Sequence, residues 1–236
     1  MSTIRWPLLV RKVHKWLALF VGIQVVLWTI TGFYMVVVHI DFIHGDHLVR
    51  AEERGAYELA SLLPVEKVIA LAPAASEVSL ATHLDRQVWR VRTKTEVFLL
   101  DGRTGDRLPA LTAREVEQVA TRLYGGEGKP VSVKLLAEAP MEMNSRKPPF
   151  WQVEFPCWTK PTLYISPTSG ELISKRHMFW RIFDFAWMLH IMDYDERSDV
   201  NNPLLRVATW SAFAMAVSGA WLLLWAFPRR KKKKAK

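Results

Sequence analysis

The sequence predicts a membrane protein of mixed helix and sheet, in which two transmembrane helices flank an extracytoplasmic domain of two α/β repeats. Three observations predict this membrane α+β fold class. Two long uncharged apolar runs lie near the ends of the chain, and all 23 acidic residues fall between these runs. A pattern of helix, strands and turn also occurs twice in the segment between them.

The two apolar runs predict transmembrane helices at 16–38 and 203–227. Trp16–Val38 contains 23 residues and Val207–Phe227 contains 21, with no charge in either run. At about 1.5 Å per residue, each can cross a hydrocarbon core of roughly 30 Å. Pro203 is expected as the first residue of the second helix, with Asn202 as its N-cap. A cleaved signal peptide is the alternative for the first run, but its length favours an uncleaved anchor.

Basic residues predict the orientation. Arg11, Lys12 and Lys15 precede the first run, and a Lys/Arg tail at 228–236 follows the second. We therefore expect residues 1–15 and 228–236 in the cytoplasm and the central domain in the periplasm, as in a bacterial inner (cell) membrane. Eleven of the 32 basic residues lie in these two ends, which leaves 21 basic against 23 acidic residues between them. The high net charge thus favours contact with membrane lipid and gives no reason to expect a nucleic-acid partner.

The central domain, 39–176, contains two predicted repeats at about 60–110 and 111–176. The first has a helical pattern at 64–72, strands at 87–92 and 96–100, and a turn at 101–106. The second has a helix from Thr112 to about Tyr124, strands at 150–155 and 162–173, and a turn in the middle of the last segment. Trp89 aligns with Trp151, and Thr104-Gly105 aligns with Ser169-Gly170, which fixes the register of the repeat.

A short helix, W-x-V on one strand and the turns DGRTGD and SPTSGE resemble the PepSY domain, here in two tandem copies. The membrane segments resemble those of PepSY-associated transmembrane proteins. The resemblance rests on RKVHKWLAL at 11–19, Thr31-Gly32, Leu189-His190, Ser218-Gly219-Ala220-Trp221 and the basic ending at 229–231. Two features depart from the family pattern: Ala18 replaces the usual Gly, and the chain has two spans where the larger members have four.

The resemblance implies a haem b-binding component of membrane electron transfer, linked to iron or siderophore reduction. A second copy of the chain or a partner subunit would then complete a four-helix membrane unit. The competing implication is a non-enzymatic anchored module that binds peptides or regulates a partner protein. The sequence contains no Gly-x-Ser-x-Gly elbow, no His-Glu-x-x-His helix and no phosphate-binding loop. Whether the chain is an enzyme stays open, and no catalytic residue is predicted.

Four histidines are candidate haem ligands, namely His14, His39, His44 and His190. His14 and His190 occupy the family positions, but a cytoplasmic anchor and an interfacial imidazole are the plain alternatives. Because they are expected at opposite membrane faces, they cannot ligate one iron together; His39 or His44 would pair with His190, and another chain would pair with His14. An aromatic interfacial helix and an acidic loop are expected at 177–202. A metal site at 44–47 is conceivable from its residue types alone and is not predicted.

Overall fold

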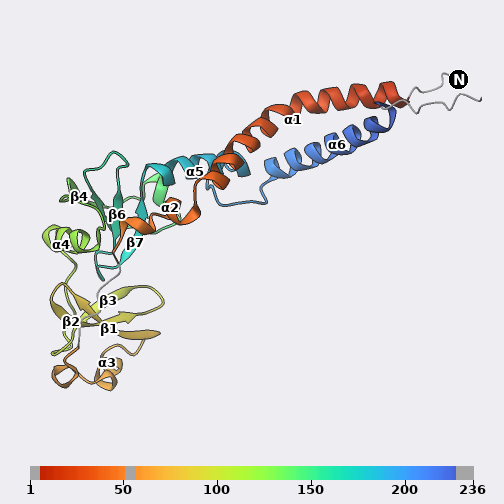
Figure 1. Cartoon of the computed structure of the whole chain (residues 1–236). Helices are drawn as coiled ribbons and strands as arrows, with labels where there is room; N and C mark the ends of the chain where they lie inside the picture. Colours follow the sequence, from red (N-terminus) through yellow and green to blue (C-terminus); the bar gives the residue numbers. More distant parts are fainter. Residues whose placement is uncertain (1–5, 51–56, 227–236) are drawn as a thin grey trace, which may run out of the picture. The chain divides into compact units, whose positions relative to one another are not determined.

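The computed structural model describes residues 6–50 and 57–226, so the predicted basic tail and the ends of the chain lie outside the described residues. The chain forms two compact units, one of residues 1–38 with 183–236 and one of residues 39–182. Figure 1 labels the helices and strands. Their bounds are α1 Trp6–Val37, α2 Ile40–His44, α3 Val65–Leu71, β1 Glu77–His83, β2 Arg86–Arg92, β3 Val97–Asp101, α4 Ala113–Leu123, β4 Ser132–Leu136, β5 Phe150–Glu154, β6 Thr162–Ile165, β7 Leu172–Arg176, α5 Met178–Ile191 and α6 Pro203–Ala226, with short 3-10 turns at Asp46–Leu48, Leu59–Ser61 and Met141–Met143.

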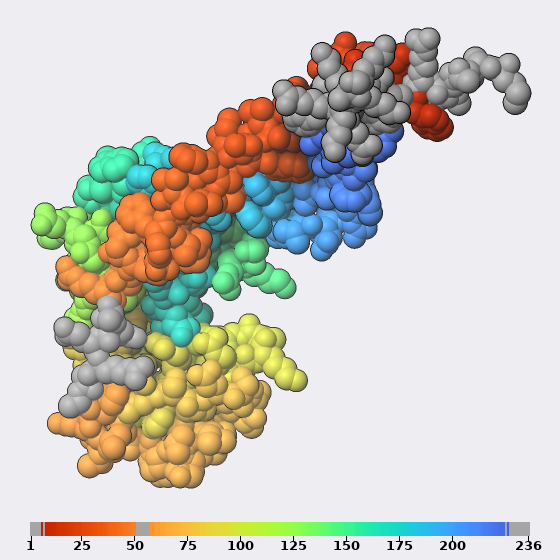
Figure 2. All heavy atoms as spheres, turned by 45° about the vertical axis from the view of Figure 1, so that its right-hand side comes forward, coloured from red at the N-terminus to blue at the C-terminus, as the bar shows by residue number. Residues whose placement is uncertain are grey.

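The helical unit is built on α1 and α6, which pack along each other (Figures 1 and 2). Both are long and apolar enough to cross a membrane over Leu8–Val37 and Pro203–Leu224. Asn202 caps α6, because its side-chain oxygen accepts the Leu205 N–H at 2.8 Å. Most of their large apolar side chains are exposed. Among the described residues of these two helices, Val21, Thr31 and Ala208 are buried, at 2%, 5% and 8% exposed.

The other unit contains two antiparallel sheets, ordered β1-β2-β3 and β4-β5-β6-β7. The expected helices precede them. Thr112 and Glu115 form a capping box at the start of α4, with the side chain of each bonded to the backbone of the other. Val116 and Ala120 of α4 are fully buried and pack against the second sheet. Strands β1 and β4 were not predicted from the alternation of apolar and polar residues.

The two sheets share one strand register at the aligned tryptophans. Trp89 on β2 lies opposite Leu100 on β3, and Trp151 on β5 lies opposite Ile165 on β6. Leu100 and Ile165 occupy equivalent positions in the sequence alignment of the two segments. Both indole N–H groups are buried and have no hydrogen-bond partner among the described residues. The second strand of each sheet therefore carries a tryptophan at the equivalent position, with its indole N–H buried.

The turn after the third strand is also repeated, bond for bond. In the first sheet the Asp101 carboxylate accepts two backbone N–H groups, and the Gly105 N–H donates to the Asp101 carbonyl. In the second sheet the Ser166 hydroxyl accepts two backbone N–H groups, and the Gly170 N–H donates to the Ser166 carbonyl. Both glycines have positive φ, 79° and 68°, which side chains with a Cβ rarely adopt. These backbone demands explain the shared Gly.

Candidate functional site

His14, on α1, is held against α6. Its Nδ1 lies 2.8 Å from the Ser218 hydroxyl and 3.2 Å from the Met215 carbonyl oxygen. The Ser218 hydroxyl in turn donates to the same Met215 carbonyl at 2.8 Å. We call His14, Ser218 and Gly219 the His14 seat, because Gly219 lies directly against the ring.

His190, on α5, is held against α1 in the same manner. Its Nδ1 lies 2.9 Å from the Thr31 hydroxyl, which itself donates to the Leu27 carbonyl at 2.7 Å. Gly32, the next residue, lies beside the ring. His190, Thr31 and Gly32 form the His190 seat. Each seat therefore consists of a histidine from one helix and a hydroxyl-glycine pair from another.

The hydrogen bonds favour one tautomer in both rings. The Ser218 and Thr31 hydroxyls already donate their protons to helix carbonyls, so each has a lone pair left to accept from Nδ1–H. A carbonyl oxygen near Nδ1 of His14 adds to this preference, since it too can only accept. Nε2 then carries the lone pair. Among the residues that the structure describes, Nε2 of neither ring has a hydrogen-bond partner.

The glycines set how closely each ring approaches the neighbouring helix. A Cβ added to Gly219 would lie 3.1 Å from Cε1 of His14, which is tighter than an ordinary contact. A Cβ added to Gly32 would lie 3.7 Å from Cε1 of His190, an ordinary van der Waals distance. Gly219 is thus required for the observed fit of its histidine, whereas Gly32 is permissive.

Three further side chains fix the end of α5 that carries His190. The last carbonyls of a helix have no partner within it and need one outside. Gln24 donates to the Leu189 carbonyl at 3.2 Å, Trp28 donates to the His190 carbonyl at 2.7 Å, and Asn202 donates to the Ile191 carbonyl at 2.9 Å. Gln24, Trp28 and Thr31 recur at helical spacing on one face of α1. The C-terminal end of the predicted aromatic helix, α5, therefore packs on α1.

The other two candidate histidines lie in the sheet-containing unit. His39 is exposed, caps α2 by accepting the Asp41 N–H at 3.3 Å, and lies 3.5 Å from the Asp41 carboxylate. His44 is the exposed last residue of α2 and borders a surface hollow of about 330 Å³ with Lys175 and Trp180. Neither has an orienting bond of the kind that His14 and His190 make. The pairing of His190 with either residue stays a prediction.

A buried histidine that is not among the four predicted haem ligands lies near α2. His177 is 1% exposed, and its Nε2 bonds the Ile43 carbonyl at 3.0 Å. Its ring packs edge-on against Phe42 and His47, which stack on each other with centroids 4.5 Å apart. Burial lowers the pKa of His177, so it is neutral at pH 7.

Within the described residues no three His, Cys, Asp or Glu side chains converge as a metal site.

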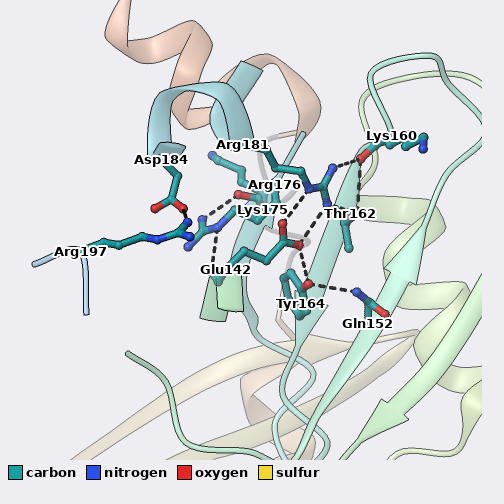
Figure 3. A network of polar contacts seen from close by, with 10 residues as sticks. All are labelled: Glu142, Gln152, Lys160, Thr162, Tyr164, Lys175, Arg176, Arg181, Asp184 and Arg197. Carbon is teal, nitrogen blue, oxygen red and sulfur yellow. Dashed lines mark hydrogen bonds and ion pairs between the residues drawn. The ribbon is translucent and has the colours of Figure 1, made fainter. Parts of the chain in front are cut away.

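A network of charged and polar side chains surrounds Glu142 (Figure 3). Arg181, at the start of α5, donates to both Glu142 oxygens, from Nε at 2.7 Å and from Nη2 at 3.0 Å. The Tyr164 hydroxyl donates to Glu142 at 2.6 Å, and burial together with this carboxylate raises the pKa of Tyr164. Arg181 also donates to the Lys160 carbonyl and to the Thr162 hydroxyl, each at 3.0 Å. The network joins the first turn of α5 to the second sheet and has the character of a structural clamp.

The predicted acidic loop precedes α6, and one of its acids is buried. Asp193 is 8% exposed, and its carboxylate accepts four backbone N–H groups, from residues 195, 196, 198 and 199. These bonds lower the pKa of Asp193. The carboxylate shapes the loop, and its oxygens are already occupied by the backbone.

The two seats agree with one requirement of haem ligation. A ligating imidazole uses one ring nitrogen for the metal and donates the other N–H to a nearby acceptor, which orients the ring. His14 and His190 each meet this requirement as a single ligand. They cannot share an iron, because residues 14 and 31 of α1 are about 26 Å apart along the helix axis. The described residues therefore offer one histidine ligand at each of two heights along α1.

Sequence reasoning named both histidines but not the side chains that orient them. Thr31-Gly32 and Ser218-Gly219 stood out as small residues, which serve close helix packing in any membrane protein. Gln24 was a further signal, as a polar amide inside an otherwise apolar run.

No family model, no curated protein and no solved structure matches this chain.

Proposed function

We propose that the protein is a haem b-binding component of inner-membrane electron transfer, linked to the reduction of iron or siderophore complexes. The single observation that carries the proposal is the repeated histidine seat. In each seat the hydroxyl donates to a helix carbonyl and lies within hydrogen-bond distance of Nδ1, an arrangement that favours the Nδ1–H tautomer and would leave the Nε2 lone pair for a metal. Haem supplies the one-electron chemistry when bound, and the chain supplies oriented neutral imidazoles.

A second chain is part of the proposal. Bis-histidine ligation needs two imidazoles on facing helices, and one chain offers one at each level. A two-fold axis along the membrane normal would bring His14 to its own copy and His190 to its own copy. Such a homodimer would also have four apolar helices, the number in the larger PepSY-associated proteins that the sequence resembles. A different partner subunit could provide the same parts.

The membrane arrangement follows the charges. Two helices have the length and hydropathy to span. Basic residues lie toward the chain end of each helix, and all 23 acidic residues lie between the two apolar runs. In the proposed topology both termini are cytoplasmic and the two PepSY-like repeats are periplasmic. The repeats are supported by the shared strand register at Trp89 and Trp151 and by the repeated turn. His14 and His190 would hold haem at two levels of the membrane, where it would supply one-electron chemistry.

Absorption spectroscopy of the detergent-purified chain tests the proposal. Spectra before and after dithionite, with a pyridine haemochrome assay, should show low-spin haem b. His14→Gln and His190→Gln should each remove one spectral component, while His83→Gln, in the soluble domain, should remove none. His39→Gln and His44→Gln separate pairing within one chain from pairing between two copies. Loss of the His190-dependent component in either variant would indicate that residue as the partner, and retention in both would indicate the copy's His190. A featureless spectrum from haem-supplied cells would overturn the proposal.

The second candidate function is an anchored module that binds peptides or regulates a partner. It is favoured by the position of both histidine seats near the helix ends, since Leu17–Val38 and Val207–Phe227 contain no histidine. The two sheets with their own buried cores also form a domain that an anchor could present. A haem-free protein that retains its fold and retains a partner on affinity purification would support this candidate.

A further inference from the structure

A cavity of about 620 Å³ lies within the sheet-containing unit, where the two repeats meet. Its walls come from five places in the chain. They are Arg50, the β1–β2 hairpin tip at 82–84, Arg90 on β2, the last turns of α4 with Arg122, and the turn at 169–172. This volume is within the range of small-molecule sites. The repeated turn of the second sheet thus forms one wall of a pocket whose opposite wall belongs to the first sheet.

The charge of the wall is positive. Three arginines border the cavity, Arg50, Arg90 and Arg122, against one carboxylate, that of Glu171. Glu171 is already paired, with Arg90 Nη1 at 3.3 Å and Arg92 Nη2 at 3.6 Å, and it accepts a bond from Ser169 at 3.2 Å. The charge of Glu171 is therefore offset by Arg90 and Arg92. Among the described residues, the wall contains no other acidic residue that could pair with Arg50 or Arg122.

The arginines have unused donors. Nε of Arg90 has no hydrogen-bond partner among the described residues, but it is buried and does not itself face the cavity, so the accessible donors belong to the exposed Arg50 and Arg122. Arg122 bonds Asp85 at 2.9 Å, but Asp85 is 87% exposed and lies outside the wall, so this pair is readily exchanged. No side-chain partner of Arg50 is found within the part of the chain that the structure describes. Each guanidinium could turn donors toward a ligand.

His83 borders the same cavity and adds no charge at neutral pH. Burial lowers the pKa of its imidazole, although Glu115 nearby acts in the opposite direction. Its ring lies beside Gly170, where an added Cβ would come within 3.0 Å of Cε1. The histidine thus acts as a neutral side wall, and the guanidiniums provide the attraction.

We propose that this cavity binds a small polyanion that carries two or more carboxylate or phosphate groups. Planar guanidinium forks hold either group through paired hydrogen bonds, and separate arginines on different elements would engage separate groups of one ligand. The proposal is independent of haem binding, because the cavity and the two histidine seats belong to different units of the chain.

Isothermal titration of the full chain in detergent, with citrate and with pyrophosphate as probes, tests the proposal. One saturable site per chain is expected, and rising salt should weaken it. Arg50→Gln with Arg122→Gln should reduce affinity about 10-fold or more, since both donors on one side of the cavity are removed. Arg103→Gln is the matched control, because Arg103 is 70% exposed, pairs with Glu58 at 3.8 Å and lies outside the wall.

The two probes decide between sources of the anion. Tighter binding of citrate identifies a polycarboxylate, and tighter binding of pyrophosphate identifies a phosphate compound. Thermal unfolding of each variant shows that it is folded, and because Arg50 and Arg122 are exposed the melting temperature should be unchanged. Failure of both probes to bind, or equal affinity in the double variant and the parent chain, would overturn the proposal whatever the haem content.

Discussion

Replacing Glu142 by Gln removes the charge at the centre of the clamp in Figure 3 and keeps its shape. Arg181 then loses a bidentate carboxylate, and the Tyr164 hydroxyl faces an amide in place of a charged acceptor. Breaking a buried pair by removing one partner costs about 3–5 kcal/mol. Glu142 is 16% exposed and Arg181 31%, and Arg181 keeps two other acceptors. We therefore expect a loss of about 2–4 kcal/mol in the free energy of unfolding.

The control for this prediction has the same chemistry at the surface. Glu96 and Arg107 also form a bidentate pair, with Nη2 at 2.6 Å and Nη1 at 3.2 Å, but their side chains are 43% and 53% exposed. Glu96→Gln should cost under about 1 kcal/mol. Thermal unfolding of the full chain, followed by circular dichroism, compares the two at roughly 2–4 °C per kcal/mol. Equal shifts in the two variants would refute the argument from burial.

Three more predictions concern single positions. Gly219→Ala should displace the His14 ring and alter the haem absorption component that depends on His14. Gly32→Ala should leave His190 in place and its component unchanged. Identical absorption spectra for the two variants would contradict this prediction. Stability should fall as pH drops below the ordinary histidine pKa of about 6.5, because the unfolded chain protonates His177 before the folded chain does; chemical unfolding between pH 7 and 5 should show a smaller loss in His177→Gln. Asp193→Asn should destabilise the loop before α6, since an amide oxygen replaces only one of the two accepting oxygens; faster amide exchange at the four donors would show it, and unchanged exchange would exclude it.

The strands and turns that the sequence predicted share a local signal. The capping box at Thr112 and the alternation around Trp89 and Trp151 depend on neighbours within a few residues, so they can be read without the fold. Strand β4 could not be found this way. Its burial pattern shows no clear alternation, since its residues are exposed or half-buried, and it forms only by pairing with β5.

The histidine seats were predictable in part. His14 and His190 were selected from their places in the chain, but their hydroxyl partners lie 204 and 159 residues away. Hydrogen bonds over such separations depend on how helices pack, and packing is not encoded in local spacing. Glu142 was missed for the same reason, because Arg181 lies 39 residues further along the chain. Asp193 differs again: its partners are local, but a cluster of acids resembles a solvated loop unless the backbone geometry is known.

The combination of groups in the two seats argues for a role beyond close packing. Helix packing in membranes needs small residues at the contact, and Ala would serve as well as Ser or Thr. Packing alone gives no reason for an imidazole opposite each hydroxyl-glycine pair. Here the hydroxyl fixes the tautomer through a proton that is already donated to the helix, and the glycine admits the ring. Ser218→Ala would therefore keep the packing and release the tautomer of His14, which separates an orienting role from a plain contact because only the former changes the His14-dependent spectrum.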